Sequence, residues 1–238
     1  MIIRKDINLT APVGSFESLK AAIKGGADSV YFGINKLNMR ARSSANFDED
    51  DLKKIIGICN EAGIDAYLTL NIVFYDNEIS QMQDIVGIAK EHGINAIIAS
   101  DQAVINYARS VNLETHISTQ VNISNYESIR HYAQYADAVV LARELNLHQV
   151  EHIYQRIIED SLCGPSGNLL KLEMFVHGAL CMSISGKCYL SLHEHNHSAN
   201  RGACLQDCRR AYIVREKEKD FELEIDNEYI MSPKDLCT

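Results

Sequence analysis

Four cysteines lie close together in the last third of the sequence and could hold a metal group. Cys181, Cys188, Cys204 and Cys208 fall within 28 positions, separated by six, fifteen and three residues. Thiolates are soft donors that suit either structural zinc or an iron-sulfur cluster. Zinc knuckles and ribbons typically use close C-x2-C pairs, and this sequence contains none there. The wider spacing therefore favours the bulkier cluster.

The other cysteines fit less specific roles, except for one near the end. Cys237 provides a fifth thiol, one more than a four-ligand site needs. Cys59, in "IIGICNEAG", fits a buried structural thiol, and Cys163, in "CGPSGN", fits an incidental surface thiol. The count of seven is odd, and thiols in a reducing compartment stay free. We therefore expect thiols or metal ligands rather than disulfides.

Length and composition favour one α/β domain over residues 1–238 of the chain. No Pro/Gly/Ser-rich linker divides the sequence, and no apolar run approaches the roughly 20 residues that span a bilayer. The start "MIIRKDINLT" lacks the apolar segment of a secretory signal, which predicts a cytoplasmic protein without membrane contact. A net charge of -9 argues against a wholly basic surface for nucleic acid but allows a local patch.

From residue 7 to about 176, short β-rich runs alternate with segments of helical period, which predicts parallel strands joined by helices. The predicted strands are 7–11, 29–32, 66–70, 96–99, 115–118, 138–141 and 172–176. The predicted helices are 15–24, 48–62, 78–91, 101–110, 126–132 and 147–159. We predict a TIM-barrel-like fold that is incomplete at the C-terminus. After its seventh strand come a cysteine-rich segment, 177–210, and a β-hairpin, 211–232.

Polar residues follow several predicted strands. They include Asn71, Gln120 and Asn122, which are candidates for substrate binding, and Arg143 and Glu144, which are candidates for catalysis. Because the carboxyl ends of parallel strands meet at one edge, these side chains should face one mouth. An open doubly wound sheet would gather them in the same way. The clustering therefore predicts a site more firmly than it predicts a barrel.

Several of these candidates have a structural alternative. His177 follows the last strand close to Cys181, so it could transfer protons, bond a cluster sulfur, or play only a structural part. Arg143 and Glu144 could orient an anionic or base-like substrate, or pair with each other at the rim. Arg40 and Arg42 could meet a phosphate or a carboxylate.

Arginines around the cysteines could give an RNA backbone a foothold, although a solvated face is the alternative. They are Arg201, Arg209, Arg210 and Arg215. The histidines of "HEHNH", residues 193–197, would share one side of an extended segment and could bind a metal, but a solvated loop is the stronger interpretation. Neither a G-x-S-x-G elbow nor an H-E-x-x-H helix accompanies Ser183 and Ser185. That favours a loop around a metal group over a protease nucleophile.

The segment "EMFVHGALCMSISGKCYLS", residues 173–191, resembles the defining segment of the U32 peptidase family. Supporting segments are "APVGSFESLKAAIKGGADSVYFG", "STQVNISN", "LAREL", "NRGAC" and "MSPKDL", so the resemblance covers nearly the whole chain. It implies a barrel-like fold with an oxygen-sensitive 4Fe-4S cluster. The family is named for collagenase-like proteolysis but also contains hydroxylases that act on RNA bases or on a quinone precursor.

Three cysteines, at 181, 188 and 204, match the family's cluster ligands, and the fourth ligand is either Cys208 or Cys237. The sequence departs from the family in "VG" after "AP" and in the "CGPSGN" insertion, neither of which contains a ligand. The resemblance favours RNA base hydroxylation, with tRNA uridine as the preferred substrate. The alternatives are a collagenase-like peptidase and a cluster-bearing subunit of a quinone-precursor hydroxylation complex. Expected partners are RNA or a small-molecule substrate, and a homo- or heterodimer.

Overall fold

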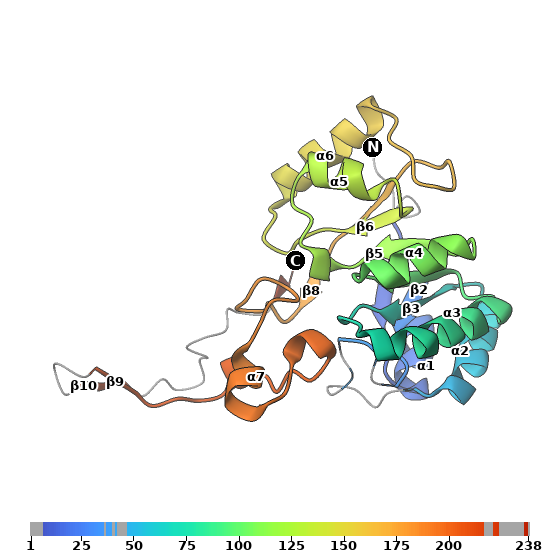
Figure 1. The fold of residues 1–238 in the computed structure, drawn as a ribbon. Coiled ribbons are helices and arrows are strands. Elements are labelled where there is room, and N and C mark those ends of the chain that lie inside the picture. Colours follow the sequence, from blue (N-terminus) through green and yellow to red (C-terminus); the bar gives the residue numbers. More distant parts are fainter. Residues whose placement is uncertain are drawn as a thin grey trace.

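Seven parallel strands form the framework of the protein. The structure, a computed structural model, describes residues 7–35, 37–39, 41, 47–216, 221–223 and 236–237. The sheet has the order β1-β2-β3-β4-β5-β6-β7, with every neighbouring pair parallel. Its strands are β1 (Thr10–Pro12), β2 (Ser29–Phe32), β3 (Asp65–Leu70), β4 (Ala96–Ala99), β5 (Glu114–Ile117), β6 (Ala138–Val140) and β7 (Lys171–Glu173). The sheet curls into a half-barrel (Figure 1), which confirms the predicted fold class.

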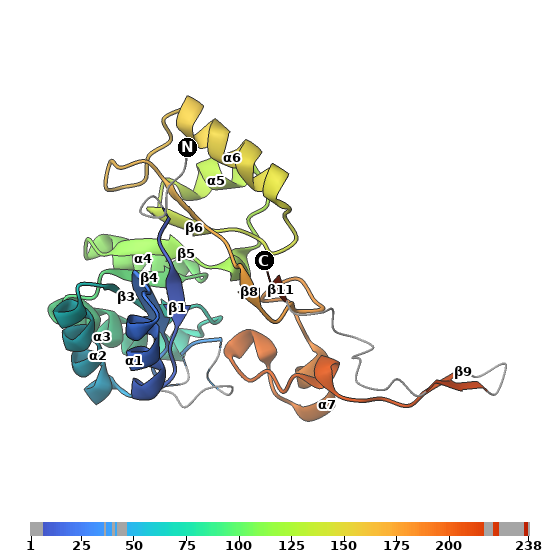
Figure 2. The same cartoon turned by 180° about the vertical axis from the view of Figure 1, so that it is seen from behind.

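Six helices connect these strands and cover the outer face of the sheet (Figures 1 and 2). They are α1 (Phe16–Lys24), α2 (Glu49–Ala62), α3 (Ile79–Glu91), α4 (Gln102–Ser110), α5 (Tyr126–Tyr132) and α6 (Leu147–Glu159). Local signals set their ends: Ser15 and Asp48 form capping boxes, and Gly63 ends α2 with a left-handed φ of 68°. The predicted helix boundaries hold to within one residue.

A single large apolar core fills the space between the sheet and the helices. Leu19 of α1, Phe32 of β2, Ile55 of α2 and Ile97 of β4 are among its fully buried members. Cys59 also belongs to this core, and burial raises the pKa of its thiol to about 11. Burial of apolar surface is the main force that stabilises such a framework. The carboxyl ends of the strands are therefore held at fixed positions.

The chain changes character after β7. Only short elements follow: β8 (His177–Gly178), α7 (Leu190–His195), and the 3-10 turns η4 (Ala199–Arg201) and η5 (Asp207–Arg209). A short strand, β11 (Leu236–Cys237), pairs antiparallel with β8. Residues 193–195 of "HEHNH" are exposed, as expected for the favoured solvated segment, but they are helical and not a loop, because they belong to α7. A helix does not place alternate residues on one side, so the alternative of three histidines aligned along an extended segment does not hold.

The central part of the predicted hairpin, residues 214–216 and 221–223, is present. Strand β9 (Val214–Glu216) pairs antiparallel with β10 (Phe221–Leu223). The hairpin extends away from the rest of the molecule (Figures 1 and 2). The other residues predicted for it, 217–220 and 224–232, lie outside the described ones.

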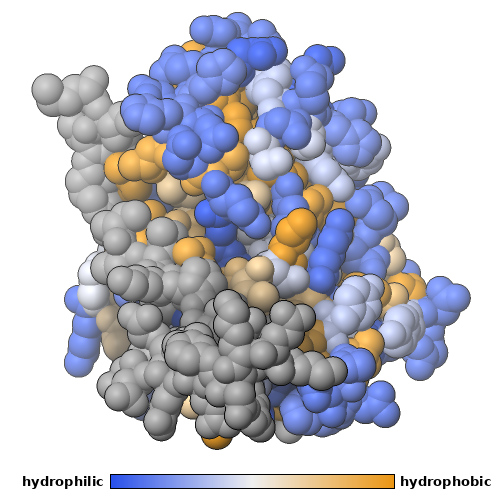
Figure 3. Space-filling view, turned by 90° about the vertical axis from the view of Figure 1, so that its left-hand side faces the viewer, coloured by the Kyte–Doolittle hydropathy of each residue, from blue (hydrophilic) through white to orange (hydrophobic). Residues whose placement is uncertain are grey.

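One side of the molecule shows apolar groups between polar surfaces (Figure 3). The exposed large apolar side chains include Leu147, Tyr154 and Ile158 of α6. Their spacing of seven and four residues places them on one face of the helix. Within the described residues, no helix combines the length and the hydropathy needed to span a bilayer.

Candidate functional site: a four-thiol set at the mouth of the half-barrel

The four predicted thiols are neighbours. Burial raises the pKa of Cys208, and the negative charges of Cys181, Cys204 and Cys188 raise it further, whereas Arg209 lowers it. Charges act on a thiol in this way only when they are close to it. Cys181 is exposed, and the other three are partly buried. Residues from the loop before α7 and from the turns after it therefore meet in one place.

The side chains of the four cysteines are not arranged around a single ion. Within the described residues, no group of three or more His, Cys, Asp or Glu side chains is placed to hold one metal ion. The donor chemistry of the thiols suits either zinc or an iron-sulfur cluster.

The second candidate for the fourth ligand lies near the same segment. The backbone of Cys237 pairs with that of His177 in β8, four residues before Cys181. Its side chain lies outside the described residues. Cys208 is the candidate whose thiol is described, and it interacts with the other three.

A buried carboxylate fixes the turn that carries Cys208. The Ser191 hydroxyl donates a hydrogen bond to Asp207 at 3.0 Å, and His195 Nε2 lies 3.1 Å from the other carboxylate oxygen. Asp207 is 3% exposed. Burial alone would raise its pKa, but the hydrogen bonds from Ser191 and His195 outweigh burial and lower it. These contacts join α7 to η5, so they hold the turn beside the cysteines in place.

An arginine predicted as part of an RNA foothold instead anchors the cysteine-rich segment. Both terminal nitrogens of Arg201 bond the Glu78 carboxylate, one of them at 2.8 Å, and its guanidinium lies 3.9 Å from the Tyr75 ring centre. The same side chain donates to the carbonyl of Val73 at 2.8 Å. The hydrogen bond from Arg201 lowers the pKa of Glu78. Arg201 is therefore not available as a surface cation.

The other predicted site residues fall into different environments. Arg143 contacts the cysteine-bearing loop, because its Nη1 donates a hydrogen bond to the Ala179 carbonyl oxygen at 3.0 Å. Glu144 and His177 are exposed. Arg40 and Arg42 lie outside the described residues. The catalytic roles of Arg143, Glu144 and His177 stay predictions.

A cavity of about 280 Å³ lies between the strand ends and the cysteine-rich segment. Asn71 lines it and is already bonded, because it accepts from Met39 N at 3.1 Å and donates to Ser118 Oγ at 3.1 Å. Asn200, from the cysteine-rich segment, also lines it and accepts a hydrogen bond from Cys188 N at 3.1 Å. The full lining is Met39, Asn71, Ile72, Val73, Ser100, Asp101, Gln120, Val121, Tyr132, Gly186, Lys187 and Asn200. Two predicted binding residues, Asn71 and Gln120, thus share one cavity with the residues next to Cys188.

Four buried side-chain atoms have no hydrogen-bond partner among the described residues. They are Thr69 Oγ1, His116 Nδ1, Gln120 Oε1 and Asn122 Oδ1. All four residues belong to β3, to β5 or to the turn that follows β5. Buried polar atoms are normally satisfied by protein, water or ligand. Unpaired atoms are therefore concentrated on the two strands that lead to the cavity.

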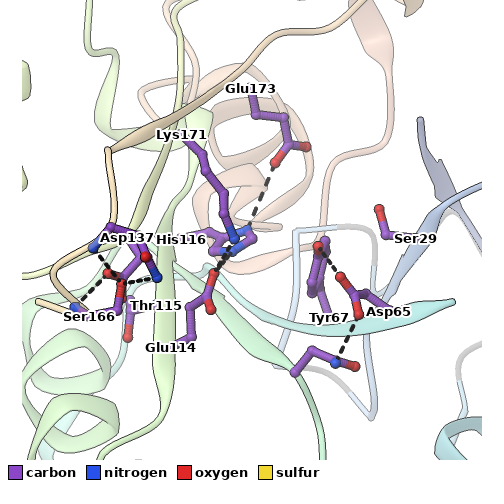
Figure 4. Close-up of polar contacts among 12 residues, drawn as sticks. Ser29, Asp65, Tyr67, Glu114, Thr115, His116, Asp137, Ser166, Lys171 and Glu173 are labelled. Atoms are coloured by element: carbon purple, nitrogen blue, oxygen red, sulfur yellow. Dashed lines mark hydrogen bonds and ion pairs between the residues drawn. The ribbon is translucent and has the colours of Figure 1, made fainter. Parts of the chain in front are cut away.

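A polar cluster that was not predicted from the sequence lies on the inner face of the sheet (Figure 4). His116 is 3% exposed; its Nε2 lies 3.1 Å from Glu114, and its Nδ1 lies 4.0 Å from Glu173. Lys171 forms an ion pair with Glu114 at 3.1 Å. Barrel interiors are usually filled by branched apolar side chains. The alternating polar positions of "ETHI" and "KLE" were the available signal.

The surroundings of the two glutamates of this cluster shift their pKa values in opposite directions. Hydrogen bonding to His116 is the main cause that lowers the pKa of Glu114 to about 2, with Lys171 also contributing. Burial raises the pKa of Glu173, and His116 offsets this only in part. Across the sheet, the Tyr67 hydroxyl donates to Asp65 at 3.2 Å, and the Tyr67 ring lies 4.7 Å from that of His116.

Fold and site together define a TIM-barrel-like α/β protein with a four-thiol set at its strand ends. Residues 14–238 match the sequence profile of Peptidase family U32, and the chain belongs to that family. A solved structure of a U32 peptidase superimposes with a TM-score of 0.58 at 11% identity, covering 72% of this chain and 69% of that one. This likeness supports the fold.

Relatives carry two kinds of name. The chain is 59% identical over 233 residues to a collagenase of Porphyromonas gingivalis, covering 98% of this chain and 56% of that protein. It is 30% identical over 242 residues to tRNA hydroxylation protein P1 of Bacillus subtilis, covering 99% and 54%. A 23S rRNA 5-hydroxycytidine synthase of Escherichia coli is 30% identical over 213 residues, covering 89% and 30%. The chain thus spans about half the length, or less, of these relatives.

Proposed function

We propose that this protein hydroxylates an RNA base with the help of a 4Fe-4S cluster, and that its substrate is tRNA uridine, converted to 5-hydroxyuridine. The reaction replaces a C–H bond of the base by C–OH, which is a two-electron oxidation. It balances with an organic hydroxyl donor as co-substrate: base–H and R–OH give base–OH and R–H, so that the donor supplies the oxygen atom and is reduced by two electrons. Molecular oxygen is not an obligatory direct substrate in this proposal. The relatives named for tRNA and rRNA hydroxylation support the assignment.

One observation carries the proposal: a small cavity has strand-end residues on one side and the cysteine-bearing segment on the other. Its volume of about 280 Å³ is at the lower end for ligand pockets. It suits a flat pyrimidine ring that has left its stack better than it suits a length of polypeptide. Gly186 and Lys187 of its wall immediately precede Cys188 in the sequence. A base bound there would lie next to the thiol set.

The cluster would be held by Cys181, Cys188 and Cys204, with Cys208 as the fourth ligand and Cys237 as its rival. When bound, such a cluster supplies one-electron transfer. The chain's own residues bind and orient the base. Asn71, already fixed by its bonds to Met39 and Ser118, shapes the strand-end wall, and Gln120 offers its amide beside it. Lys187 offers positive charge to a phosphate or a carboxylate at the rim.

The competing proposal is a collagenase-like peptidase, which the 59% identity to a protein of that name favours. The geometry supports it less. Ser191, Asp207 and His195 are joined, but the aspartate lies in the middle, so the serine bonds the carboxylate and not the histidine that would activate it in a triad. Ser185 is 5% exposed and bonded to Arg143. Neither arrangement provides an activated nucleophile.

The test is a comparison of modified nucleosides in tRNA and rRNA, by mass spectrometry, between a strain that lacks the gene and its parent. We expect 5-hydroxyuridine derivatives to disappear and to return when the gene is restored. A gene that encodes Cys188→Ser should not restore them. Unchanged nucleosides in the deletion strain would refute the hydroxylase assignment.

Gelatin hydrolysis by the purified protein separates the peptidase from the hydroxylase. Hydrolysis that survives replacement of the four cysteines but is lost on a serine or histidine substitution would favour the peptidase. A third possibility is a cluster-bearing subunit of a heterodimer that acts on a quinone precursor. A stable copurifying partner, together with no activity of the isolated chain, would identify it.

A further inference from the structure

One guanidinium group joins both ends of the loop that carries Cys181. Arg143 lies three residues after the end of β6, in the strand-end region. Its Nη1 donates to the carbonyl of Ala179 at 3.0 Å, and its Nη2 donates to the hydroxyl of Ser185 at 2.6 Å. These acceptors lie two residues before and four residues after Cys181. The planar fork of arginine suits such a two-point contact better than lysine does.

A second strand-end residue fixes the same loop from β5. Asn122 donates from Nδ2 to the carbonyl of Ser185 at 2.8 Å and to the carbonyl of Gln120 at 2.9 Å. Its own φ of 60° is left-handed, a conformation that asparagine tolerates. Gly186 rests against Gln120 so closely that a Cβ atom there would lie 2.8 Å from Gln120 Oε1. The end of the loop near Cys188 therefore packs against the turn after β5 and is hydrogen-bonded to it.

Bringing four thiolates together has an electrostatic cost, because like charges at short distance repel one another. Contacts within the loop are few and local, such as Lys187 N donating to the Ile184 carbonyl at 3.1 Å. Metal sites bind best when supporting residues hold the ligands in place beforehand.

From these contacts we infer that Arg143 and Asn122 are positioning residues that hold Cys181 beside the other thiols before any metal group binds. The thiol set is then preorganised by the strand ends rather than assembled by the metal. The inference concerns the metal-free chain. It rests on the proposed function in one respect only: the expectation that a preorganised thiol set helps the protein to retain a cluster.

The test uses reduced, metal-free protein and dibromobimane, a reagent that crosslinks neighbouring thiols. Peptide mapping then measures the yield of crosslinks between Cys181 and Cys204 or Cys208. In Arg143→Gln we expect this yield to fall about tenfold, because the loop loses both anchoring bonds and the local thiol concentration drops. Arg143→Lys keeps the charge but not the fork, so an intermediate yield is expected.

Arg130→Gln is the matched control, because Arg130 pairs only with exposed Glu127 among the described residues, at 3.2 Å. Its crosslink yield should equal that of the unmodified protein. Ser185→Ala removes one acceptor without changing the framework and should give a partial loss, which keeps the test valid if Arg143→Gln fails to fold. A folded Arg143→Gln protein with an unchanged yield of Cys181 crosslinks would overturn the inference.

Iron analysis of anaerobically purified protein separates this inference from the proposed function. A fall in crosslinking without iron in the unmodified protein would leave the positioning role standing and remove the cluster. Iron in the unmodified protein, with crosslinks unaffected by Arg143→Gln, would keep the cluster and remove the positioning role.

Discussion

The strand-and-helix framework, residues 7–176, and the cysteine-rich segment, 177–210, are held in different ways. The framework buries a large apolar core, and its elements begin and end at capping residues and glycines. The segment has only short elements and is attached by a few polar contacts, chiefly those of Arg201, Arg143 and Asn122. Burial of apolar surface therefore dominates the stability of the framework, whereas the position of the segment depends more on individual side chains.

Among the tests of this difference, the largest loss of stability is expected at Gly202, where the segment meets Asn38 and Ala41. A Cβ atom at Gly202 would lie 2.2 Å from the Asn38 carbonyl oxygen, and the glycine has a φ of +80°. Gly202→Ala should displace the segment and cost about 3 kcal/mol or more of stability, because both strain and overlap oppose it. Thermal unfolding and hydrogen exchange of residues 188–208 would measure this cost.

Gly167→Ala is the control for that substitution. Gly167 has the same φ of +80°, but a Cβ atom there would have no heavy atom within 4 Å, so only backbone strain of roughly 1 kcal/mol is expected. If Gly202→Ala and Gly167→Ala lowered the stability by the same amount, the contact between Gly202 and Asn38 would not anchor the segment.

A smaller effect is expected at Arg201. Arg201→Met removes two bonds to Glu78 and one to Val73, and should raise hydrogen exchange and proteolysis in the segment by an amount equivalent to about 1–3 kcal/mol. The framework should keep its exchange rates. Arg130→Met, which breaks an exposed pair with Glu127, should cost at most about 0.5 kcal/mol. Loss of protection throughout the framework after Arg201→Met would contradict the division into two regions.

The smallest expected effect is on the pH dependence of stability, and it concerns two glutamates of the framework. Glu114 has a folded pKa of about 2, below the usual 4.5, so its stabilising contribution is complete above pH 4.5 and is lost as the pH falls toward 2. Glu114→Gln should therefore lower the melting temperature at pH 6 more than at pH 3. Burial raises the pKa of Glu173, so Glu173→Gln should have the opposite sign at pH 6, a small gain. If both variants changed the melting temperature at pH 6 in the same direction, His116 would not stabilise the charged form of Glu114 in preference to that of Glu173, as described.

The sequence predicted the framework well because its signals are local. Helix ends at Ser15, Asp48 and Gly63 are read from neighbouring residues, and the strands are short apolar runs. Cys181, Cys188 and Cys204 were singled out from the sequence as metal ligands, with Cys208 or Cys237 as the fourth, and this ligand set stays a prediction. The helical state of residues 193–195 was missed, because an alternating histidine pattern says little about a six-residue helix that packs on η5.

Contacts between distant residues could not be predicted in the same way. Arg201 and Glu78 are 123 positions apart, and nothing in either local sequence indicates their pairing. Arg143 was recognised as a strand-end residue, but its acceptors at Ala179 and Ser185 depend on how the cysteine loop folds back. The polar inner face around His116 was overlooked because each of its strands has only three or four residues.

Metal analysis of the protein, purified without oxygen, tests the central claim most directly. Iron and acid-labile sulfide should be present in equal amounts, and visible absorption should bleach on exposure to air. Cys188→Ser should lose both iron and sulfide, whereas Cys163→Ser, at an exposed thiol outside the set, should keep both. Protein with neither iron nor sulfide, or with zinc alone, would contradict the assignment of the four thiols to an iron-sulfur cluster.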